Sequence, residues 1–144
     1  MALITAERIH GDYNLAITDA TGNKMNIDIP VEQGGNGNGI RPMQALLAAL
    51  CGCSSVDIVA ILKKQKQNLT HIKISVDGNR EENKEPSMWQ NVQLVFELTG
   101  DVQLEKAIRA ADLSITKYCS VAETLRRAGA TITYQVVLNG TTIL

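Results

Sequence analysis

The fold is decided by one stretch, residues 34–64, which reads GGNGNGIRPMQALLAALCGCSSVDIVAILKK. Its glycine-rich start runs into Pro42, and proline suits the first position of a helix because its φ is already helical and no N–H is needed there. From Met43 to Leu62 the segment is apolar on almost every side, which is typical of a helix buried in a core. The same segment carries two cysteines, a serine pair and Asp57 in its middle. We therefore expect a central helix with polar chemistry inside the core.

Length and composition bound the class of protein. The chain has 144 residues, which suits one domain, 1–144, with a core of its own. The formal net charge is −1 and lysines and arginines form no block, which argues against nucleic acid or an anionic membrane as a partner. Aromatic residues make up only 3% of the chain, so aliphatic side chains must fill the core. Burial between subunits would supplement such a core.

The N-terminal sequence and the number of cysteines indicate the cellular compartment. MALITAERIHGDY lacks the cationic start and apolar segment of a secretory signal, and the longest apolar run, Ala45–Cys51, is too short for a membrane span. We expect a cytoplasmic protein without a membrane helix. Three cysteines in a reducing compartment indicate buried or reactive thiols instead of a disulfide framework. Cys51 and Cys53 are not spaced as C-x-x-C and lack a nearby histidine, so we expect no metal site and no cofactor.

Alternation of apolar and polar residues predicts the strands. The predicted strands are Ile4–Ile9, Tyr13–Thr18 and Met25–Ile29, joined as an antiparallel meander, and then Leu69–Asp77, Val92–Leu98 and Ala130–Leu138. A long exposed loop, 79–86, joins the fourth and fifth strands. Apolar spacing predicts an amphipathic helix over 102–117. The run Gly34–Gly39 lacks the Lys-Ser/Thr of a P-loop, so we interpret it as a flexible lead-in to the central helix.

A second cysteine stretch follows the amphipathic helix. Ser120 and Glu123 match a capping box, which predicts a short helix with Ser120 as its N-cap and Cys119 just before it. The amide groups and dipole at a helix start favour a thiolate, so Cys119, or a thiol docked beside it, is expected to have a lowered pKa. The alternative that Cys119 packs as a hydrophobic staple stays open.

The two cysteine stretches resemble the OsmC/Ohr family, which comprises osmotically inducible protein C and the organic hydroperoxide resistance proteins. The matching segments are Gly39–Gln44, Leu46–Asp57 and Ala110–Val121, in the family's order along the chain. The resemblance covers nearly the whole chain. It implies an α+β fold in which antiparallel sheets wrap around two central helices, built as an intertwined homodimer.

The resemblance also implies a reaction. Cys53 matches the attacking cysteine of the family and Cys119 the second, resolving cysteine, whereas Cys51 is interpreted as a core residue. The family's chemistry would make the chain a thiol-dependent peroxidase for organic hydroperoxides, with inorganic peroxide as a second substrate class. The Cys53 thiolate would become a sulfenic acid, Cys119 would condense with it to an intramolecular disulfide, and an external dithiol would reduce that bond.

The chain departs from the family at the residues that support the attacking thiol. Active members carry a glutamate at one of the two positions after the proline, where this chain has Met43 and Gln44. In the family that glutamate orients an arginine that polarises the peroxide, and a neutral Gln44 can only donate or accept hydrogen bonds. Arg8 and Arg41 are the candidates for the arginine.

Asp57 lies within the matching stretch but bears on the reactivity of the attacking thiol. It lies four residues after Cys53 and so on the same helical face, where an ionised carboxylate would raise the pKa of the thiol. A second function therefore stays open, that of a non-catalytic OsmC-like dimer that binds a small apolar ligand or acts as a redox-responsive protein.

Overall fold

The structure, a computed structural model, describes residues 3–144, so the first two residues of the N-terminal stretch examined for a signal lie outside the described part. Contacts divide the chain into two compact units, one that ends at Ala48 and one that spans Ala49–Leu144. Helix α1, Pro42–Lys64, contributes its first turns to the former and the rest to the latter. That the chain forms a single domain stays a prediction.

The N-terminal unit holds a three-stranded antiparallel sheet. Its strands are β1 (Ile4–His10), β2 (Asn14–Asp19) and β3 (Lys24–Ile27), in the order β1-β2-β3. The turn between β2 and β3 is built on Asp19, whose carboxylate accepts the backbone N–H groups of Thr21 and Asn23 at 2.8 and 2.9 Å. The predicted meander is confirmed.

The glycine-rich loop is organised by a buried carboxylate. Asp28 has no exposed surface, and its side chain accepts three backbone N–H groups, those of Ile29, Asn36 and Asn38, at 2.8, 3.1 and 3.1 Å. The chain passes so close to itself that a Cβ at Gly35 would meet the Ile29 carbonyl, which explains the glycine there. The interpretation of this loop as a flexible lead-in is wrong, because hydrogen bonds to one side chain hold it.

The C-terminal unit is a mixed sheet with helices on one face. Its elements in chain order are β4 (Asn68–Arg80), β5 (Trp89–Asp101), α2 (Leu104–Leu113), a π-helical turn η2 (Ser114–Tyr118), α3 (Ser120–Arg127), β6 (Thr131–Leu138) and β7 (Thr141–Thr142). The strand order is β4-β5-β6-β7. Strands β5 and β6 run parallel, because the helices between them form a crossover connection. The predicted α+β class holds, but this sheet is mixed where wholly antiparallel sheets were expected.

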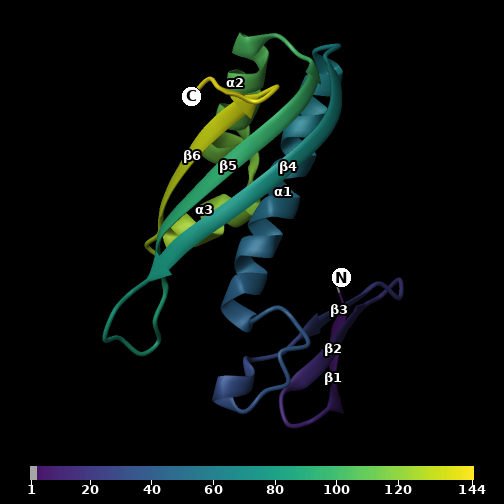
Figure 1. Ribbon diagram of the computed structural model, residues 1–144, viewed down its shortest axis with the longest axis vertical. Coiled ribbons are helices and arrows are strands. Elements are labelled where there is room, and N and C mark those ends of the chain that lie inside the picture. Colours follow the sequence, from purple (N-terminus) through teal and green to yellow (C-terminus); the bar gives the residue numbers. More distant parts are fainter. Residues whose placement is uncertain (1–2) are drawn as a thin grey trace. The chain divides into compact units, whose positions relative to one another are not determined.

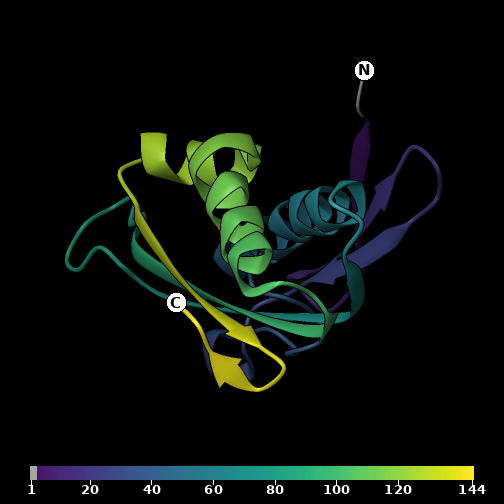
Figure 2. The same cartoon turned by 90° about the horizontal axis from the view of Figure 1, so that it is seen from above.

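The helices of this unit cover one face of its sheet. Figures 1 and 2 show α2, α3 and the C-terminal part of α1 on the same side of β4, β5 and β6. The residues of β5 that point toward the helices, Val92, Leu94, Phe96 and Leu98, are buried, as are Leu50, Ile58 and Leu62 of α1. Three buried alanines of α2, Ala107, Ala110 and Ala111, let that helix approach the sheet closely.

Helix α1 is longer than the apolar run, Ala45–Cys51, on which the argument against a membrane helix was based. It is long and apolar enough to cross a membrane by length and composition, a test that the core helix of a soluble protein also passes. The seven-residue run Ala45–Cys51 understated it, because Gly52 and the serines that follow continue the helix. The helix ends where Lys66 takes a left-handed conformation with φ 57°, and the Gln67 N–H donates back to the Leu62 carbonyl.

We predict that Asp28→Asn loosens the glycine-rich loop. Burial alone raises the pKa of Asp28, but the three N–H donors outweigh it and hold the pKa below 3.8. The unfolded chain therefore takes up the proton first, so the stabilisation is present above about pH 4 and is lost as the pH falls further. Hydrogen exchange of the Asn36 and Asn38 amides should be faster in Asp28→Asn at neutral pH and less sensitive to acid.

The matched control is Asp12→Asn, which removes an exposed carboxylate outside the loop. Equal protection of both amides in wild type and Asp28→Asn at neutral pH would refute this account of the loop.

Candidate active site

Cys53 lies in the middle of α1 and is half-buried. The polar residue after it is accommodated within the helix, since the buried Ser54 hydroxyl donates to the Leu50 carbonyl at 2.7 Å. The residue next to Cys53 in the helix is therefore a hydrogen-bonded serine, and the surroundings of Cys53 are not wholly apolar.

Cys119 is the N-cap of α3. Its backbone is extended, with φ −72° and ψ 104°, and its Sγ accepts the backbone N–H of Ala122 at 3.4 Å. The expected capping box is wrong by one residue, because the sulfur takes the capping role predicted for Ser120. The other member of that box, Glu123, instead pairs with Arg126 and Arg127 at 3.0 and 2.9 Å.

A π-helical turn directly precedes Cys119 and determines its position. The predicted helix over 102–117 is α-helical only to Leu113, after which the π-helical turn η2 follows. The Cys119 N–H closes this turn on the Ser114 carbonyl at 2.7 Å. Such widened turns insert an extra residue and change the direction in which the following side chains point, and they are frequent at functional sites.

The fold brings three chemically active groups together. The sulfurs of Cys53 and Cys119 and a carboxylate oxygen of Asp57 all lie within 4.8 Å of one another, although the cysteines are 66 positions apart in the chain. Cys119 is buried, with 2% of its surface exposed, while Cys53 and Asp57 are half-buried. We call these three residues the thiol–carboxylate cluster.

Ser114 holds the carboxylate of this cluster in place, a role that the sequence analysis missed. Its buried hydroxyl donates to Asp57 Oδ2 at 3.0 Å and lies 3.4 Å from the Ser54 carbonyl. A sequence signal existed, since Ser114 is a polar residue in register with the buried alanines Ala107, Ala110 and Ala111 of α2.

Burial and the neighbouring Cys53 determine how readily Cys119 ionises. Burial is the largest of the effects that together raise the pKa of Cys119 to about 11; the Ala122 N–H lowers the pKa, and a hydrogen bond and the charge of Cys53 raise it. The expectation of a lowered pKa at Cys119 is therefore wrong, because burial outweighs the helix start. Near neutral pH Cys119 is therefore expected to hold its proton, which it must release before or while its sulfur acts as a nucleophile. Burial also raises the pKa of Cys51.

The residues expected to support the attacking thiol belong to the N-terminal unit. Arg8 is exposed on β1, Arg41 is exposed just before α1, and Gln44 is exposed in the first turn of that helix. Their roles toward Cys53 stay predictions. In the C-terminal unit, Arg126 and Arg109 form ion pairs with Glu123 and Asp112.

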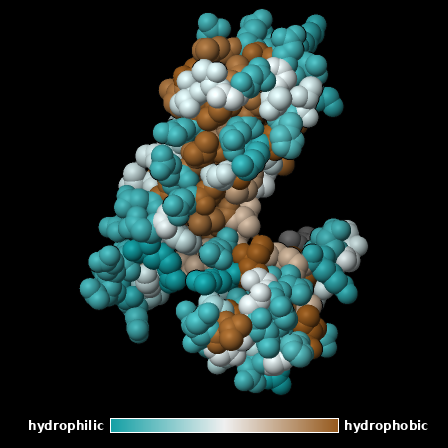
Figure 3. Space-filling view, in the orientation of Figure 1, coloured by the Kyte–Doolittle hydropathy of each residue, from teal (hydrophilic) through white to brown (hydrophobic). Residues whose placement is uncertain are grey.

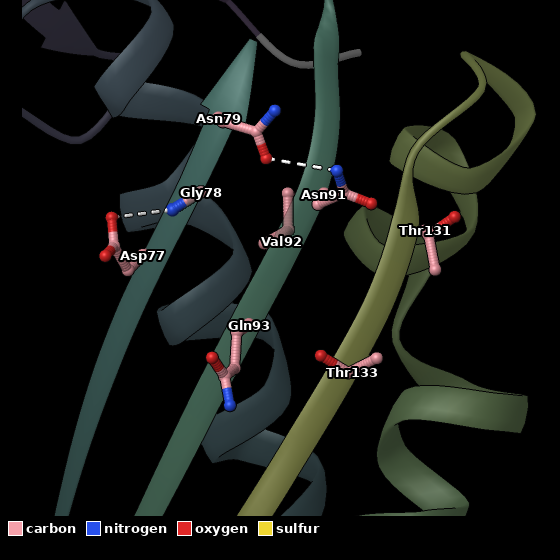
Figure 4. Close-up of a pocket in the computed structure, with 8 residues that line it drawn as sticks. All are labelled: Asp77, Gly78, Asn79, Asn91, Val92, Gln93, Thr131 and Thr133. Atoms are coloured by element: carbon pink, nitrogen blue, oxygen red, sulfur yellow. Dashed lines mark hydrogen bonds between the residues drawn. The ribbon is translucent and has the colours of Figure 1, made fainter.

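A separate polar hollow lies on the sheet. It has a volume of about 350 Å³ and is lined by Asp77, Gly78, Asn79, Asn91, Val92, Gln93, Thr131 and Thr133. Figure 4 shows these residues on β4, β5 and β6, with Asn91 donating to Asn79 across the strands at 3.1 Å. Its lining offers amides, hydroxyls and one carboxylate but no thiol, so it is distinct from the thiol–carboxylate cluster.

Known proteins share this arrangement of elements. The model of the family described as OsmC-like protein matches residues 35–135. Protein YhfA of Escherichia coli K12 is 39% identical over 98 residues, which are 67% of this chain and 72% of YhfA. A hypothetical protein from Aquifex aeolicus VF5 superposes with a TM-score of 0.78 at 26% identity, covering 96% of this chain and 98% of that one. An organic hydroperoxide resistance protein OsmC from Legionella pneumophila superposes with a TM-score of 0.71 at 20% identity, covering 95% and 96%. The predicted OsmC-like fold is confirmed.

We predict that Cys119 alkylates only in strongly alkaline solution. Its thiolate forms around pH 11, so iodoacetamide should label it slowly at neutral pH. Cys53→Ala removes the neighbouring charge and hydrogen bond and should move the pH midpoint of Cys119 labelling downward, although burial will keep it above that of a free cysteine. Peptide mass spectrometry of samples quenched across the pH range measures both midpoints.

Cys51→Ala is the control, because Cys51 is not among the groups that raise the pKa of Cys119. Labelling of Cys119 at neutral pH as fast as a free cysteine would contradict the electrostatic account.

Proposed function

The chain belongs to the OsmC-like protein family, and we propose that it is a thiol-dependent peroxidase that reduces organic and inorganic hydroperoxides. The observation that carries the proposal is the approach of the Cys53 and Cys119 sulfurs to within 4.8 Å. A relative described as an organic hydroperoxide resistance protein, from Legionella pneumophila, has the same fold.

Cys53 is the attacking residue. Its thiolate attacks the distal oxygen of ROOH, the O–O bond breaks, and the alkoxide leaves with a proton from solvent as ROH. The sulfur is oxidised to a sulfenic acid and the peroxide is reduced. Cys53 fits this role better than Cys119, because it is half-buried and peroxide can approach it, whereas Cys119 is covered.

Cys119 is the resolving residue. Its sulfur attacks the sulfenic sulfur of Cys53, the S–O bond breaks, and water leaves with the Cys119 proton. The two sulfurs lie at most 4.8 Å apart, and the S–S bond of a disulfide is about 2.05 Å long. Their separation therefore has to shorten by less than about 3 Å. An external dithiol then reduces the disulfide to two thiols and is itself oxidised, which closes the cycle.

Gln44, Arg41 and Arg8 are proposed to support the reaction. A guanidinium from Arg8 or Arg41 would polarise the peroxide, and Gln44 would orient it by a hydrogen bond where other family members use a charged glutamate. Because a neutral amide pairs an arginine more weakly than a carboxylate does, we expect slower oxidation of Cys53 than in members with the glutamate.

We propose that the active form is a homodimer. Within the C-terminal unit, α1 presents an exposed stripe of small and apolar residues, Gly52, Val56, Val59 and Ala60, opposite its buried stripe. Figure 3 shows hydrophobic surface, in brown, on this unit. At about 100° per residue, Cys53 lies between the exposed and buried stripes, so a second copy seated on α1 would line one side of the active site.

A second candidate function rests on an apolar hollow between α1 and α2. It has a volume of about 430 Å³ and is lined by Ile61, Gln65, Glu105, Lys106, Arg109 and Leu113. Apolar side chains beside two cationic groups, a carboxylate and an amide suit a small amphiphile, so a dimer that binds such a ligand without catalysis is the alternative. Either function is proposed for the cytoplasm, where the three thiols would be kept reduced.

We predict that one equivalent of an organic hydroperoxide converts the reduced protein to a Cys53–Cys119 disulfide. Turnover should require both residues, so Cys53→Ser lowers peroxide consumption with dithiothreitol to the uncatalysed background. Cys51→Ser is the matched control and should keep full turnover, because no step uses Cys51. Non-reducing peptide mapping identifies the disulfide, and a ferrous xylenol orange assay follows the peroxide.

Persistent free thiols after treatment with excess hydroperoxide would refute the peroxidase and leave the ligand-binding alternative. That alternative predicts that a medium-chain fatty acid raises the thermal midpoint of the protein, and that Leu113→Glu abolishes the shift.

We predict that Val56→Glu separates the dimer. Val56 is 68% exposed in a single copy, and a buried unpaired carboxylate at an interface costs several kcal/mol. Sedimentation equilibrium should find the variant monomeric at concentrations where wild type is dimeric. Thr133→Glu, a matched change of an exposed β-branched residue on β6, should leave the dimer intact. A monomeric wild type would refute the assembly.

A further inference from the structure

The thiol–carboxylate cluster has the composition and spacing of a metal site. Cys53 and Asp57 are four residues apart on α1, so they project from one face of the helix, and Cys119 meets them from the start of α3. Their three ligand atoms lie within 4.8 Å of one another. Around a tetrahedral zinc ion with Zn–S bonds of about 2.3 Å, two sulfurs lie about 3.8 Å apart, so a modest contraction would bring these atoms into coordination.

We propose that Cys53, Asp57 and Cys119 bind one zinc ion in the reduced protein. Two thiolates select a soft or borderline metal over magnesium or calcium. The half-buried flank formed by Cys53 and Asp57 leaves the fourth position open to water, as in zinc sites with three protein ligands. The sequence predicts no metal site around Cys51 and Cys53; the proposed site instead combines Cys53 and Asp57 with Cys119, which is distant in the chain.

The surroundings of the cluster supply the contacts that orient ligands. The Ser114 hydroxyl holds Asp57 Oδ2 at 3.0 Å and leaves the carboxylate further lone pairs for a metal. The Ala122 N–H donates to the Cys119 sulfur at 3.4 Å and would offset the charge of a metal-bound thiolate. Both donors come from within the described C-terminal unit, so the site does not depend on the other unit.

Binding and oxidation compete for the same sulfurs. Zinc displaces up to two thiol protons, and the lone pairs that coordinate it are the ones that would attack a peroxide. If the chain is a peroxidase as proposed above, zinc therefore inhibits it and protects the thiols, and chelation restores activity. Metal binding itself does not depend on that function.

The test is a cobalt titration of the reduced, full-length protein without oxygen and without peroxide. One equivalent of Co²⁺ per chain should produce thiolate-to-cobalt charge-transfer absorption and the visible bands of a tetrahedral site, and one equivalent of Zn²⁺ should abolish them. Asp57→Asn should weaken binding at least about tenfold, and Ser114→Ala should weaken it less. Cys51→Ser is the matched control and should bind as wild type does.

Labelling provides a second readout that does not depend on variants folding. Zinc should slow iodoacetamide modification of Cys53 in the wild-type protein and leave Cys51 unaffected. Binding that is not stoichiometric, or that Cys51→Ser removes while Asp57→Asn does not, would overturn the site. Peroxide consumption is measured separately on chelator-treated protein. The experiment therefore distinguishes a protein that binds zinc but consumes no peroxide from one that consumes peroxide but binds no zinc.

Discussion

The structure depends on how one helix and the start of another meet. Helix α1 is held on the sheet by Leu50, Ile58 and Leu62, and the chain after α2 must turn sharply to place α3 beside it. The π-helical turn η2 makes that turn, and the N-cap of α3 is a cysteine. This packing brings the two sulfurs and a carboxylate oxygen of Asp57 within 4.8 Å of one another. The proposed redox chemistry and the proposed metal binding both rest on that one juxtaposition.

Burial sets the character of the cluster. The pKa of a thiol at a helix start is ordinarily lowered, but burial is the main cause that raises the pKa of Cys119 to about 11. Cys53 keeps contact with solvent, and Asp57 is fixed by a hydrogen bond from Ser114. A half-buried thiol beside a buried one supports the proposed order of oxidation, with Cys53 first. In both proposals, the peroxide or the metal-bound water approaches from the half-buried side of Cys53 and Asp57.

Much of this could be predicted from the sequence, and the remainder could not for physical reasons. Pro42 and the apolar run after it predicted α1, and alternation predicted the meander and the β4–β5 hairpin. The parallel pairing of β5 with β6 was missed because alternation of apolar and polar residues predicts where strands lie but not whether neighbouring strands run parallel or antiparallel. Asp28 fell inside the predicted strand Met25–Ile29 and its role could not be foreseen, since its three N–H partners include two from a loop whose path depends on it. Ser114 was missed because its partner is 57 positions away.

Trapping the sulfenic acid tests the central claim most directly. In Cys119→Ser the resolving thiol is gone, so one equivalent of hydroperoxide should leave an oxidised Cys53 that dimedone captures at that residue, as mass spectrometry would record. Wild type treated in the same way should show little adduct, because Cys119 consumes the intermediate. Capture at Cys51 in place of Cys53, or no capture in Cys119→Ser while the protein remains folded, would contradict the account.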